Sequence, residues 1–326
     1  MNILITGAAG FVGRKLVNHL LGTPTLIVDG QERTLQQLTL WDVAPWDLPS
    51  APDGIEINQV IGDLQDSDRL AGVFAGGIDA VIHLAAVVSS AAETDFDLGV
   101  AVNFEATRSL LEICRHQGNA PLFMFASSVA VFGGTLPDVI SDDTAPTPQS
   151  SYGTQKAMCE LLVNDYSRRG YVNGRTLRLP TIIIRPGKPN KAASTFASSI
   201  IREPLNGEPA TCPVPADTAM FVQSPRRVVK AFVHGIGLKS EDFGSNRILN
   251  LPGITVTVTQ MIEALHSARG DGAVDLISWD NDDKIRAIVE SWPARFDTAR
   301  ASSLGFCADD GMDDILSIFI SDEMPA

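Results

Sequence analysis

A short glycine-rich stretch, GAAGFVG at residues 7–13, constrains the fold of this chain more than any other feature. The residues before it, Met1–Thr6, are apolar and β-branched, which favours a buried strand that the first glycine stops. The residues after it, 14–22, have the spacing of a helix that ends at glycine. A turn between a strand and a helix is the context that a dinucleotide-binding site requires. We therefore predict such a site here, against the alternative of a small-residue turn that merely packs well.

The residues of this turn have separate expected tasks. Gly7 permits the tight turn, Gly10 lets the backbone approach a pyrophosphate, and Gly13 lets the helix pack close to the strand. The helix then presents free N–H groups and the positive end of its dipole to the phosphates. Phe11 and Val12, at the helix start, join the three glycines as candidate cofactor-binding residues.

Strands and helices are expected to alternate through the next part of the chain. Strand-like runs follow at Leu38–Val43, Asn58–Ile61, Asp79–Ala86, Leu122–Phe132 and Arg175–Ile184, and helix-like runs at Asp95–Gln117 and Tyr152–Arg169. This alternation predicts an α/β fold with a doubly wound parallel sheet of the Rossmann type. Right-handed crossovers then bring the carboxyl ends of the strands to one edge of the sheet, where ligands bind.

Beyond Arg185 the pattern changes, and Pro, Ser and Thr become frequent. Helices are expected near Thr195–Arg202, 225–238 and 257–269, and a strand at Arg247–Leu251. We predict a dinucleotide-binding domain at 1–187 and a smaller lobe at 188–326. This lobe is mainly substrate-binding, and some of its segments return to the main domain.

Composition limits the class of partner. The 326 residues carry a formal net charge of −14, which argues against nucleic acid or an anionic membrane. Cys114, Cys159, Cys212 and Cys307 lack metal-ligand spacing, so no metal site is predicted and buried thiols in a reducing compartment are expected. Neither a signal peptide nor an apolar run of about 18 residues is apparent, which favours the cytoplasm.

An acid after the second strand is expected to hold the cofactor ribose. Asp29 and Asp42 compete, and neither has the usual spacing of about 20 residues from the glycine turn. We prefer Asp42, because its segment has the better strand character and residues 30–33 resemble a surface insertion. Either acid would repel a 2′-phosphate, so NAD is favoured over NADP, although Arg14 and Arg33 keep NADP open.

Tyr152 and Lys156 form the strongest candidate for catalysis. They lie at positions i and i+4, on one face of a predicted helix. A lysine ammonium one turn away stabilises the phenolate and lowers the tyrosine pKa, so the pair can exchange a proton with an alcohol. Ser127 and Ser128 end a strand at the ligand edge, where a hydroxyl could bond the substrate oxygen. The alternatives are a chance pair on a helix surface and two serines that satisfy a turn.

These motifs together resemble the extended short-chain dehydrogenase/reductases, the NAD-dependent epimerase/dehydratase family. The resemblance covers the whole chain and is most specific over residues 1–187. The matching pieces are TGAAGFVG, Asp42, GDL at 62–64, HLAA at 83–86, Asn103, ASSVAVFG, YGTQK and RLPTIIIRPG at 178–187.

The resemblance implies a role for particular residues. Ser128 matches the catalytic hydroxyl, Tyr152 the acid/base, and Lys156 the residue that lowers the tyrosine pKa and binds the nicotinamide ribose. Phe132 departs from the family's usual tyrosine at its turn, which is not the catalytic one. The expected cofactor-binding residues also include Asp63, which could instead cap a turn, Leu64, Leu84, Ala85, Ala86, Asn103 and Pro180.

The substrate is expected to be a small sugar acid. Most relatives act on nucleotide-linked sugars, but Gln223–Arg227 replaces the His-Val-Asp-Asp stretch that these relatives carry. Two later segments, SIIREPLNGEPATCPV and WPARFDTARASSLGF, resemble instead a branch of the family. This branch oxidises D-erythronate at C2 to 2-oxo-tetronate with NAD. A carboxylate favours an arginine fork, and the candidate cations are Arg185, Lys188, Arg202, Arg226 and Arg227, with Arg227 preferred.

Further substrate contacts are expected from Ser89, Ser127 and Thr181, near strand ends, whereas His83 is interpreted as a satisfied core histidine. Two other functions stay open: a nucleotide-sugar epimerase or dehydratase with the same Tyr/Lys pair, and a catalytically silent cofactor sensor. Relatives usually dimerise through two long helices, here expected near 95–117 and 152–169. The sequence leaves open the exact sugar acid, its stereochemistry and the reaction direction.

Overall fold

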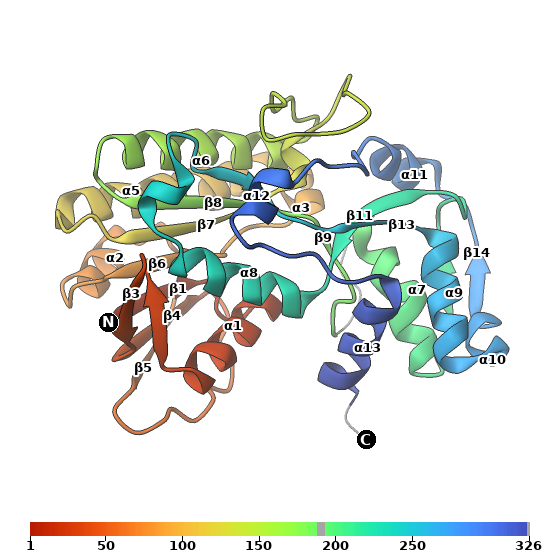
Figure 1. Ribbon diagram of the computed structural model, residues 1–326, viewed down its shortest axis with the longest axis horizontal. Coiled ribbons are helices and arrows are strands. Elements are labelled where there is room, and N and C mark those ends of the chain that lie inside the picture. The colour runs from red at the N-terminus through yellow and green to blue at the C-terminus, as the bar shows by residue number, and fades with distance from the viewer. Residues whose placement is uncertain (188–192, 325–326) are drawn as a thin grey trace. The chain divides into compact units, whose positions relative to one another are not determined.

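The computed structural model describes residues 1–187 and 193–324, which form two compact units (Figure 1). Unit 1 contains Met1–Ser128, Ser150–Arg178 and Val229–Leu249. Unit 2 contains Val129–Gln149, Leu179–Val228 and the C-terminal part from Asn250. The functional division predicted at residue 187 stays a prediction.

Unit 1 is built on a seven-stranded sheet in the order β12-β8-β7-β6-β1-β4-β5. The strands are β1 Asn2–Thr6, β4 Gln37–Asp42, β5 Glu56–Ile61, β6 Ala80–His83, β7 Leu122–Ser128, β8 Asn173–Leu179 and β12 Ile248–Asn250. The central strand β1 pairs in parallel with β4 on one side and β6 on the other. This topology confirms the predicted Rossmann-type α/β fold, and it brings the ends of β1, β4, β6 and β7 to one edge.

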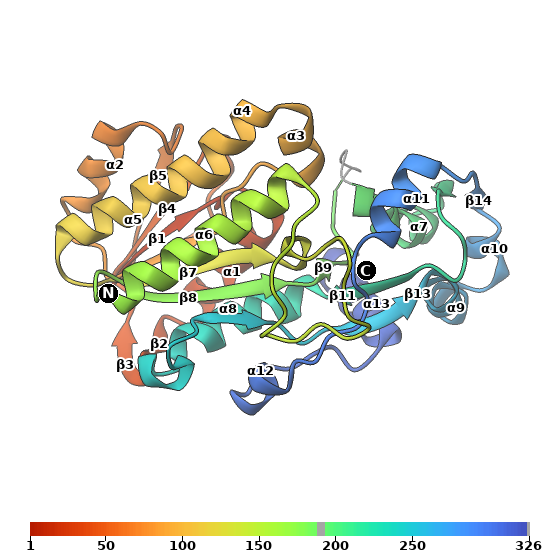
Figure 2. The same ribbon diagram turned by 90° about the horizontal axis from the view of Figure 1, so that it is seen from above.

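Three helices cover one face of this sheet, and α5 and α6 run side by side in both views (Figures 1 and 2). They are α2 Ser67–Phe74, α5 Ala106–Gln117 and α6 Ser151–Arg168. The apolar core beneath them includes Leu4 and Phe125 of the sheet and Leu110, Cys159 and Val163 of the helices. Because alternate strand residues face opposite sides, the same strands also present an apolar surface to α1, Phe11–Gly22, which lies on the other face.

The predicted helix Asp95–Gln117 changes its winding along its length. It begins as α4, Phe96–Gly99, continues as the π-helical segment η1, Val100–Glu105, and ends as α5. A shorter helix, α3, Ser89–Thr94, precedes it. A π-helical turn inside an α-helix is rare and often marks a functional site, which directs attention to Asn103 at its centre.

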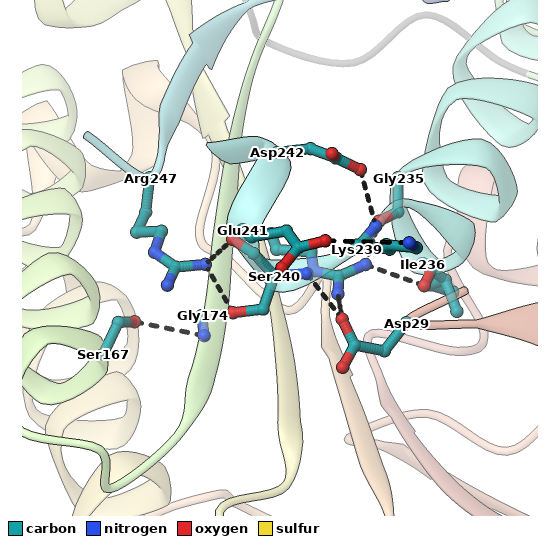
Figure 3. Close-up of polar contacts among 11 residues, drawn as sticks. Asp29, Ser167, Gly174, Gly235, Ile236, Lys239, Ser240, Glu241, Asp242 and Arg247 are labelled. Carbon is teal, nitrogen blue, oxygen red and sulfur yellow. Dashed lines mark hydrogen bonds and ion pairs between the residues drawn. The ribbon is translucent and has the colours of Figure 1, made fainter. Parts of the chain in front are cut away.

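Residues 30–33, interpreted as a surface insertion, belong to a two-stranded antiparallel hairpin formed by β2, Thr25–Val28, and β3, Gln31–Thr34. Its turn residue Asp29 bonds the fully buried Arg175 of β8 at 2.9 Å (Figure 3). The backbone N–H of Asp29 also donates to the carbonyl of Ile236, at the end of α8, Pro225–Gly237. The hairpin is thereby fixed to the main sheet, and a short helix η4, Ser240–Phe243, follows α8.

Unit 2 has its own core around the three-stranded sheet β13-β11-β9. Its strands are β9 Thr181–Ile182, β10 Ala210–Cys212, β11 Ala219–Gln223, β13 Ile254–Thr257 and β14 Ile277–Trp279. Its helices are η2 Val129–Val131, η3 Ala193–Thr195, α7 Phe196–Leu205, α9 Val258–Arg269, α10 Asp271–Val274, α11 Asp283–Glu290, α12 Ala299–Ser303 and α13 Met312–Glu323. The core joins Ile200 of α7, Val222 of β11, Leu265 of α9 and Phe319 of α13.

One predicted element is wrong in its extent. The single strand expected at Arg175–Ile184 is divided at Pro180, because proline has no backbone N–H to donate to a sheet. The part before it is β8 of the large sheet, and the part after it is β9, which pairs with β11. The chain therefore passes from one sheet to another at this proline.

Candidate active site

The glycine turn follows β1 directly, and two of its glycines are required by the protein's own packing. Gly7 has a φ of 73°, and a Cβ added there would lie 2.7 Å from the backbone nitrogen of Ala85. A Cβ on Gly13 would lie 2.3 Å from the carbonyl oxygen of Gly7. Gly10 differs, because a Cβ there would meet only that same oxygen, at 3.2 Å. The protein's own packing therefore gives little reason for glycine at this position. A ligand that approaches the backbone gives a better one.

The N-terminus of α1 has the electrostatic character that phosphates require. Among the residues that the structure describes, no side chain caps this helix end by a hydrogen bond, and no acid lies in its first turn. The N-cap residue is Gly10, and the helix begins at Phe11. Backbone donors and the helix dipole at such an end attract anions, so the turn fits the pyrophosphate of a dinucleotide.

Asp42 ends β4 next to this turn. Its Oδ2 accepts a hydrogen bond from the N–H of Ala9 at 2.9 Å, and its Oδ1 accepts one from Ala44 at 3.2 Å. Asp29 is engaged elsewhere, because its Oδ1 accepts from Arg175 and from the N–H of Ser240, the latter at 2.6 Å (Figure 3). The geometry thus favours Asp42 as the ribose-binding acid, and the contact itself stays a prediction.

The arginines that kept NADP open have local partners. Arg14 donates from Nε to the carbonyl of Ala9 at 2.7 Å, and its guanidinium lies 5.1 Å from the ring centroid of Trp46. Arg33 donates to the side chain of Gln31 within the hairpin. Asp63 accepts a hydrogen bond from the N–H of Gln65 at 3.0 Å, so it does cap its own turn.

The loop after β6 forms a further part of the same sheet edge. Leu84, Ala85 and Ala86 are half-buried there, and Leu64 is buried after β5. Asn103 is 1% exposed and ties this loop to the helices: its Oδ1 accepts from the N–H of Val87 at 2.8 Å.

The amide of Asn103 makes two further hydrogen bonds. Its Nδ2 donates to the carbonyl of Val87 at 3.1 Å and to Oε1 of Gln155 at 2.8 Å. Asn103 thus holds the position of the loop, and its predicted contact with a cofactor is untested.

His83 is a core residue, as interpreted from the sequence. Its two ring nitrogens lie 2.6 Å from Oγ1 of Thr6 and 2.9 Å from Oγ1 of Thr107. Burial, with a smaller contribution from Lys156, lowers the pKa of His83 to about 3. A histidine that is buried, neutral and hydrogen-bonded at both nitrogens is not available as a general base at neutral pH.

Lys156 lies on one face of α6 with Tyr152, as the spacing predicts. Ser150 caps this helix by accepting from the N–H of Gly153 at 3.1 Å, which fixes its start just before Tyr152. The Lys156 Nζ is buried, donates to the carbonyl of Ala126 at 2.8 Å and lies 5.7 Å from the ring centroid of Tyr152. An ammonium at this distance favours the phenolate form of the tyrosine.

Burial has an opposing effect on the lysine itself, because it lowers the pKa of Lys156 to about 8. Ser128 is the last residue of β7, two positions after the carbonyl that Lys156 contacts. The hydroxyl of Ser127 points elsewhere, since it donates to the buried carboxylate of Glu160. A direct role of Ser127 in substrate binding remains a prediction.

This chain is similar to known proteins over most or all of its length. The model of the NAD dependent epimerase/dehydratase family matches residues 3–219. The chain belongs to this family. It is 51% identical over 322 residues to D-erythronate dehydrogenase of Cupriavidus necator, covering 99% of this chain and 98% of that protein. It is 46% identical over 324 residues to D-erythronate dehydrogenase of Haemophilus influenzae, covering 99% of this chain and all of that protein.

A solved structure is also similar to this chain. The nucleoside-diphosphate-sugar epimerase from Agrobacterium tumefaciens is 42% identical, with a TM-score of 0.94, over 99% of this chain and 94% of that chain. The prediction of an enzyme of the NAD-dependent epimerase/dehydratase family is confirmed. A nicotinamide cofactor follows from this membership, whereas the choice between NAD and NADP does not.

The candidate carboxylate-binding cations of unit 2 differ in how firmly they are paired. Arg202 contacts Glu203, and Arg226 contacts Asp322, as expected for structural ion pairs. Arg227 lies 3.9 Å from Asp309, which is a long contact. Lys188 lies outside the described residues.

Other family residues of unit 2 follow β8. Arg185 donates from Nε to the carbonyl of Ile182 at 3.0 Å, and Thr181 pairs with Val222 in the small sheet. Pro180 lies 3.0 Å from the position that a Cβ on Gly253 would take. Ser89, in unit 1, begins α3.

Sequence reasoning missed three buried polar residues of unit 1: Gln155, Glu160 and Arg178. Glu160 follows Lys156 by one helical turn, and a glutamate on the apolar side of a helix is a signal that could have been noticed. Arg178 interrupts an apolar strand in the same way. Across residues 1–187 and 193–324, no group of three or more His, Cys, Asp or Glu side chains is arranged to hold a metal ion. In the same residues, no helix is long and apolar enough to cross a membrane.

Proposed function

We propose that this protein is a D-erythronate dehydrogenase, which oxidises the C2 hydroxyl of D-erythronate to give 2-oxo-tetronate with NAD. The observation that carries the proposal is the near-half identity, over essentially the whole chain, to two D-erythronate dehydrogenases. The buried Lys156 ammonium beside Tyr152 supplies the chemistry that such an oxidation needs.

Oxidation of an alcohol requires removal of the hydroxyl proton as the carbonyl forms. Tyr152, as phenolate, accepts this proton, and the positive charge of Lys156 stabilises that phenolate. Ser128 donates a hydrogen bond to the same substrate oxygen and holds it in place. Bound NAD supplies the acceptor for the hydride that leaves C2.

The residues that would hold the cofactor are those of the sheet edge. The glycine turn, with Phe11 and Val12, takes the pyrophosphate, because α1 presents an end without a side-chain cap. Asp42 takes the adenosine ribose, and its charge favours NAD over NADP. The proposed set is completed by Asp63, Leu64, Leu84, Ala85, Ala86, Asn103, Tyr152, Lys156 and Pro180.

The substrate carboxylate is assigned to Arg227. Arg227 forms a long ion pair with Asp309, at 3.9 Å, and its side chain is 24% exposed. Asp309 instead accepts short hydrogen bonds from the N–H and hydroxyl of Ser224, so Arg227 keeps capacity for a second anion. Ser89, Thr181 and Arg185 complete the proposed substrate-binding set with Ser128 and Tyr152.

Assembly as a homodimer and a cytoplasmic location belong to the same proposal. Four apolar side chains on α4 and α6 are exposed: Phe96 at 62%, Leu98 at 43%, Met158 at 36% and Leu161 at 69%. Exposed apolar side chains grouped on two helices are typical of an interface between protein chains. Mass measurement in solution, with Leu161→Glu as the disrupting variant, tests this assembly.

A nucleotide-sugar epimerase is the second candidate, favoured by the name of the similar solved structure. It would use the same Tyr152 and Lys156, but it returns the hydride to the substrate and accumulates no reduced cofactor. Purified protein is incubated with four- to six-carbon aldonates and uronates and with NAD or NADP, and the absorbance of the reduced nicotinamide is followed. Net NADH formation with D-erythronate supports the proposal. No reduction with any sugar acid, together with turnover of a nucleotide sugar, favours the epimerase.

A further inference from the structure

Two consecutive residues at the end of β7 contact α6, immediately before Ser128. The carbonyl of Ala126 accepts from Lys156, and the hydroxyl of Ser127 donates to Glu160. Lys156 and Glu160 are one helical turn apart, on the same side of α6. The contacts therefore fix both the rotation of α6 and its position along the strand.

Glu160 does not depend on Ser127 alone. Its carboxylate is 1% exposed and accepts two hydrogen bonds from Arg178 of β8, at 2.9 Å from Nε and 2.7 Å from Nη2. A two-point contact between a planar guanidinium and a carboxylate is directional. The helix is thus tied to two adjacent strands, β7 and β8, by a single buried carboxylate.

The position of this carboxylate also matters for charge. Burial lowers the pKa of Lys156, whereas the neighbouring Cys159 and, after it, Glu160 raise this pKa and so oppose that effect. An ion pair buried in this way is costly to assemble and weak evidence for stability alone. The location of Glu160 is better explained by its effect on the position of α6 and on the charge of Lys156.

We propose that Ser127, Glu160 and Arg178 are positioning residues that hold the Tyr152–Lys156 pair of α6 in register with Ser128 at the end of β7. The inference rests on the proposed function for the role of these three catalytic groups. It assigns Ser127 to the support of the site, in place of the substrate contact expected from the sequence.

The same helix offers a matched comparison at its other end. Ser167 is also a buried serine that ties α6 to β8, because its hydroxyl accepts from the N–H of Gly174 at 3.1 Å (Figure 3). It lies seven residues, or about two helical turns, beyond Glu160. Loss of either hydroxyl removes one link between helix and sheet, but only Ser127 adjoins the reacting groups.

The test follows the ionisation of Tyr152 directly, so that it does not depend on the substrate. The chain has only three tyrosines, and the ultraviolet difference spectrum between each protein and its Tyr152→Phe counterpart isolates the phenolate of Tyr152. The variants are Ser127→Ala, Ser127→Thr, the double variant Glu160→Gln/Arg178→Gln, which removes both charges of the buried ion pair together, and Ser167→Ala as control. Thermal unfolding and the pH profile of kcat and KM accompany each titration.

We expect Ser127→Ala and the double variant to raise the ionisation midpoint of Tyr152 by about 1 pH unit, since the ammonium is then displaced or less populated. The acid limb of kcat should move by the same amount, Ser127→Thr should restore it, and Ser167→Ala should lower only the melting temperature. An unchanged midpoint in Ser127→Ala, or an equal shift in Ser167→Ala, overturns the inference. If the double variant does not fold, the three serine variants decide.

The two proposals fail in different ways. Absence of D-erythronate oxidation by the unmodified protein, with the midpoint still raised in Ser127→Ala, removes the proposed substrate and leaves the positioning role. Oxidation of D-erythronate with no shift in any variant removes the positioning role and leaves the substrate.

Discussion

The ammonium of Lys156 lies 2.8 Å from the carbonyl oxygen of Ala126, in the interior of unit 1. Ala126 belongs to β7, so the charge on the helix is anchored to the strand that carries Ser128. Burial holds the pKa of this lysine at about 8, close to the pH at which an enzyme operates. The pair Tyr152 and Lys156 can therefore respond to small changes in their surroundings.

Removal of this charge should act on catalysis more than on binding. Lys156→Met is expected to lower kcat by about 10²- to 10⁴-fold, because Tyr152 then ionises only at high pH. Tyr152→Phe should abolish turnover and keep cofactor affinity, measured by fluorescence titration. Lys284→Met, at an exposed position of α11, should leave turnover unchanged. Full activity of Tyr152→Phe would exclude this tyrosine from the mechanism.

His83 should make the fold sensitive to acid. Its pKa is about 3 in the folded chain, against an ordinary value of 6.5, so between these values only the unfolded chain binds the proton. The free energy of unfolding should fall as the pH drops below 6.5, by up to about 1.4 kcal/mol per pH unit. Unfolding by denaturant at several pH values should show a shallower dependence for His83→Gln, with the exposed His116→Gln as control. Equal slopes in all three proteins would contradict the assignment.

Two glycines of the turn are expected to have different roles, Gly13 in packing and Gly10 in the approach of the cofactor. Gly13→Ala should destabilise the fold, because its Cβ would lie 2.3 Å from a backbone oxygen. Gly10→Ala meets only one oxygen, at 3.2 Å, so it should fold and bind the dinucleotide at least about 10-fold more weakly. Gly22→Ala, with nothing within 4 Å, is the control. Calorimetric titration with NAD and thermal unfolding distinguish the two effects, and unaltered affinity in Gly10→Ala would count against the phosphate site.

Asp42 should control the choice of cofactor, whereas Asp29 should not. Asp42→Asn is expected to raise KM for NAD and to lower that for NADP, since a negative charge no longer repels the 2′-phosphate. Asp29→Asn removes the negative charge that pairs with the buried Arg175 and should lower the melting temperature without changing the NAD/NADP ratio. A changed ratio in Asp29→Asn alone would reverse the assignment of the ribose-binding acid.

Arg227 should affect the sugar acid and not the dinucleotide. Arg227→Ala is expected to raise KM for D-erythronate by about 10- to 100-fold, with KM for NAD unchanged, because a charge-assisted fork to the carboxylate is lost. Arg226→Ala is the adjacent control, since Arg226 is bonded to Asp322. Steady-state kinetics with both substrates varied gives the answer. An equal rise of KM in the two variants would point to a general effect of charge.

Much of unit 1 could be predicted because its signals are local. The turn before α1 is recognised by its glycines. Tyr152 and Lys156, at i and i+4, lie on one face of any helix that contains them. The division of a strand at Pro180 was missed, because an apolar run does not reveal which of two sheets each half will join. Glu160 and Arg178 were missed for a related reason. Each is a charged residue in an apolar segment, but its partner is not apparent until the fold brings β7, β8 and α6 together.

The π-helical segment at Val100–Glu105 lets one continuous helix make two different sets of contacts, first with the loop after β6 and then with the sheet. Wider winding over these residues changes the angular phase between what precedes them and α5 by a fraction of a turn. The amide of Asn103 can then point at Val87 while Leu110 and Leu111, further along, still lie against the sheet. A one-residue deletion here would restore regular α-helical winding and would leave the helix on either side in about the same phase. The π-helical segment therefore lets Asn103 hold the loop after β6, beside the glycine turn, without changing how α5 packs in the core.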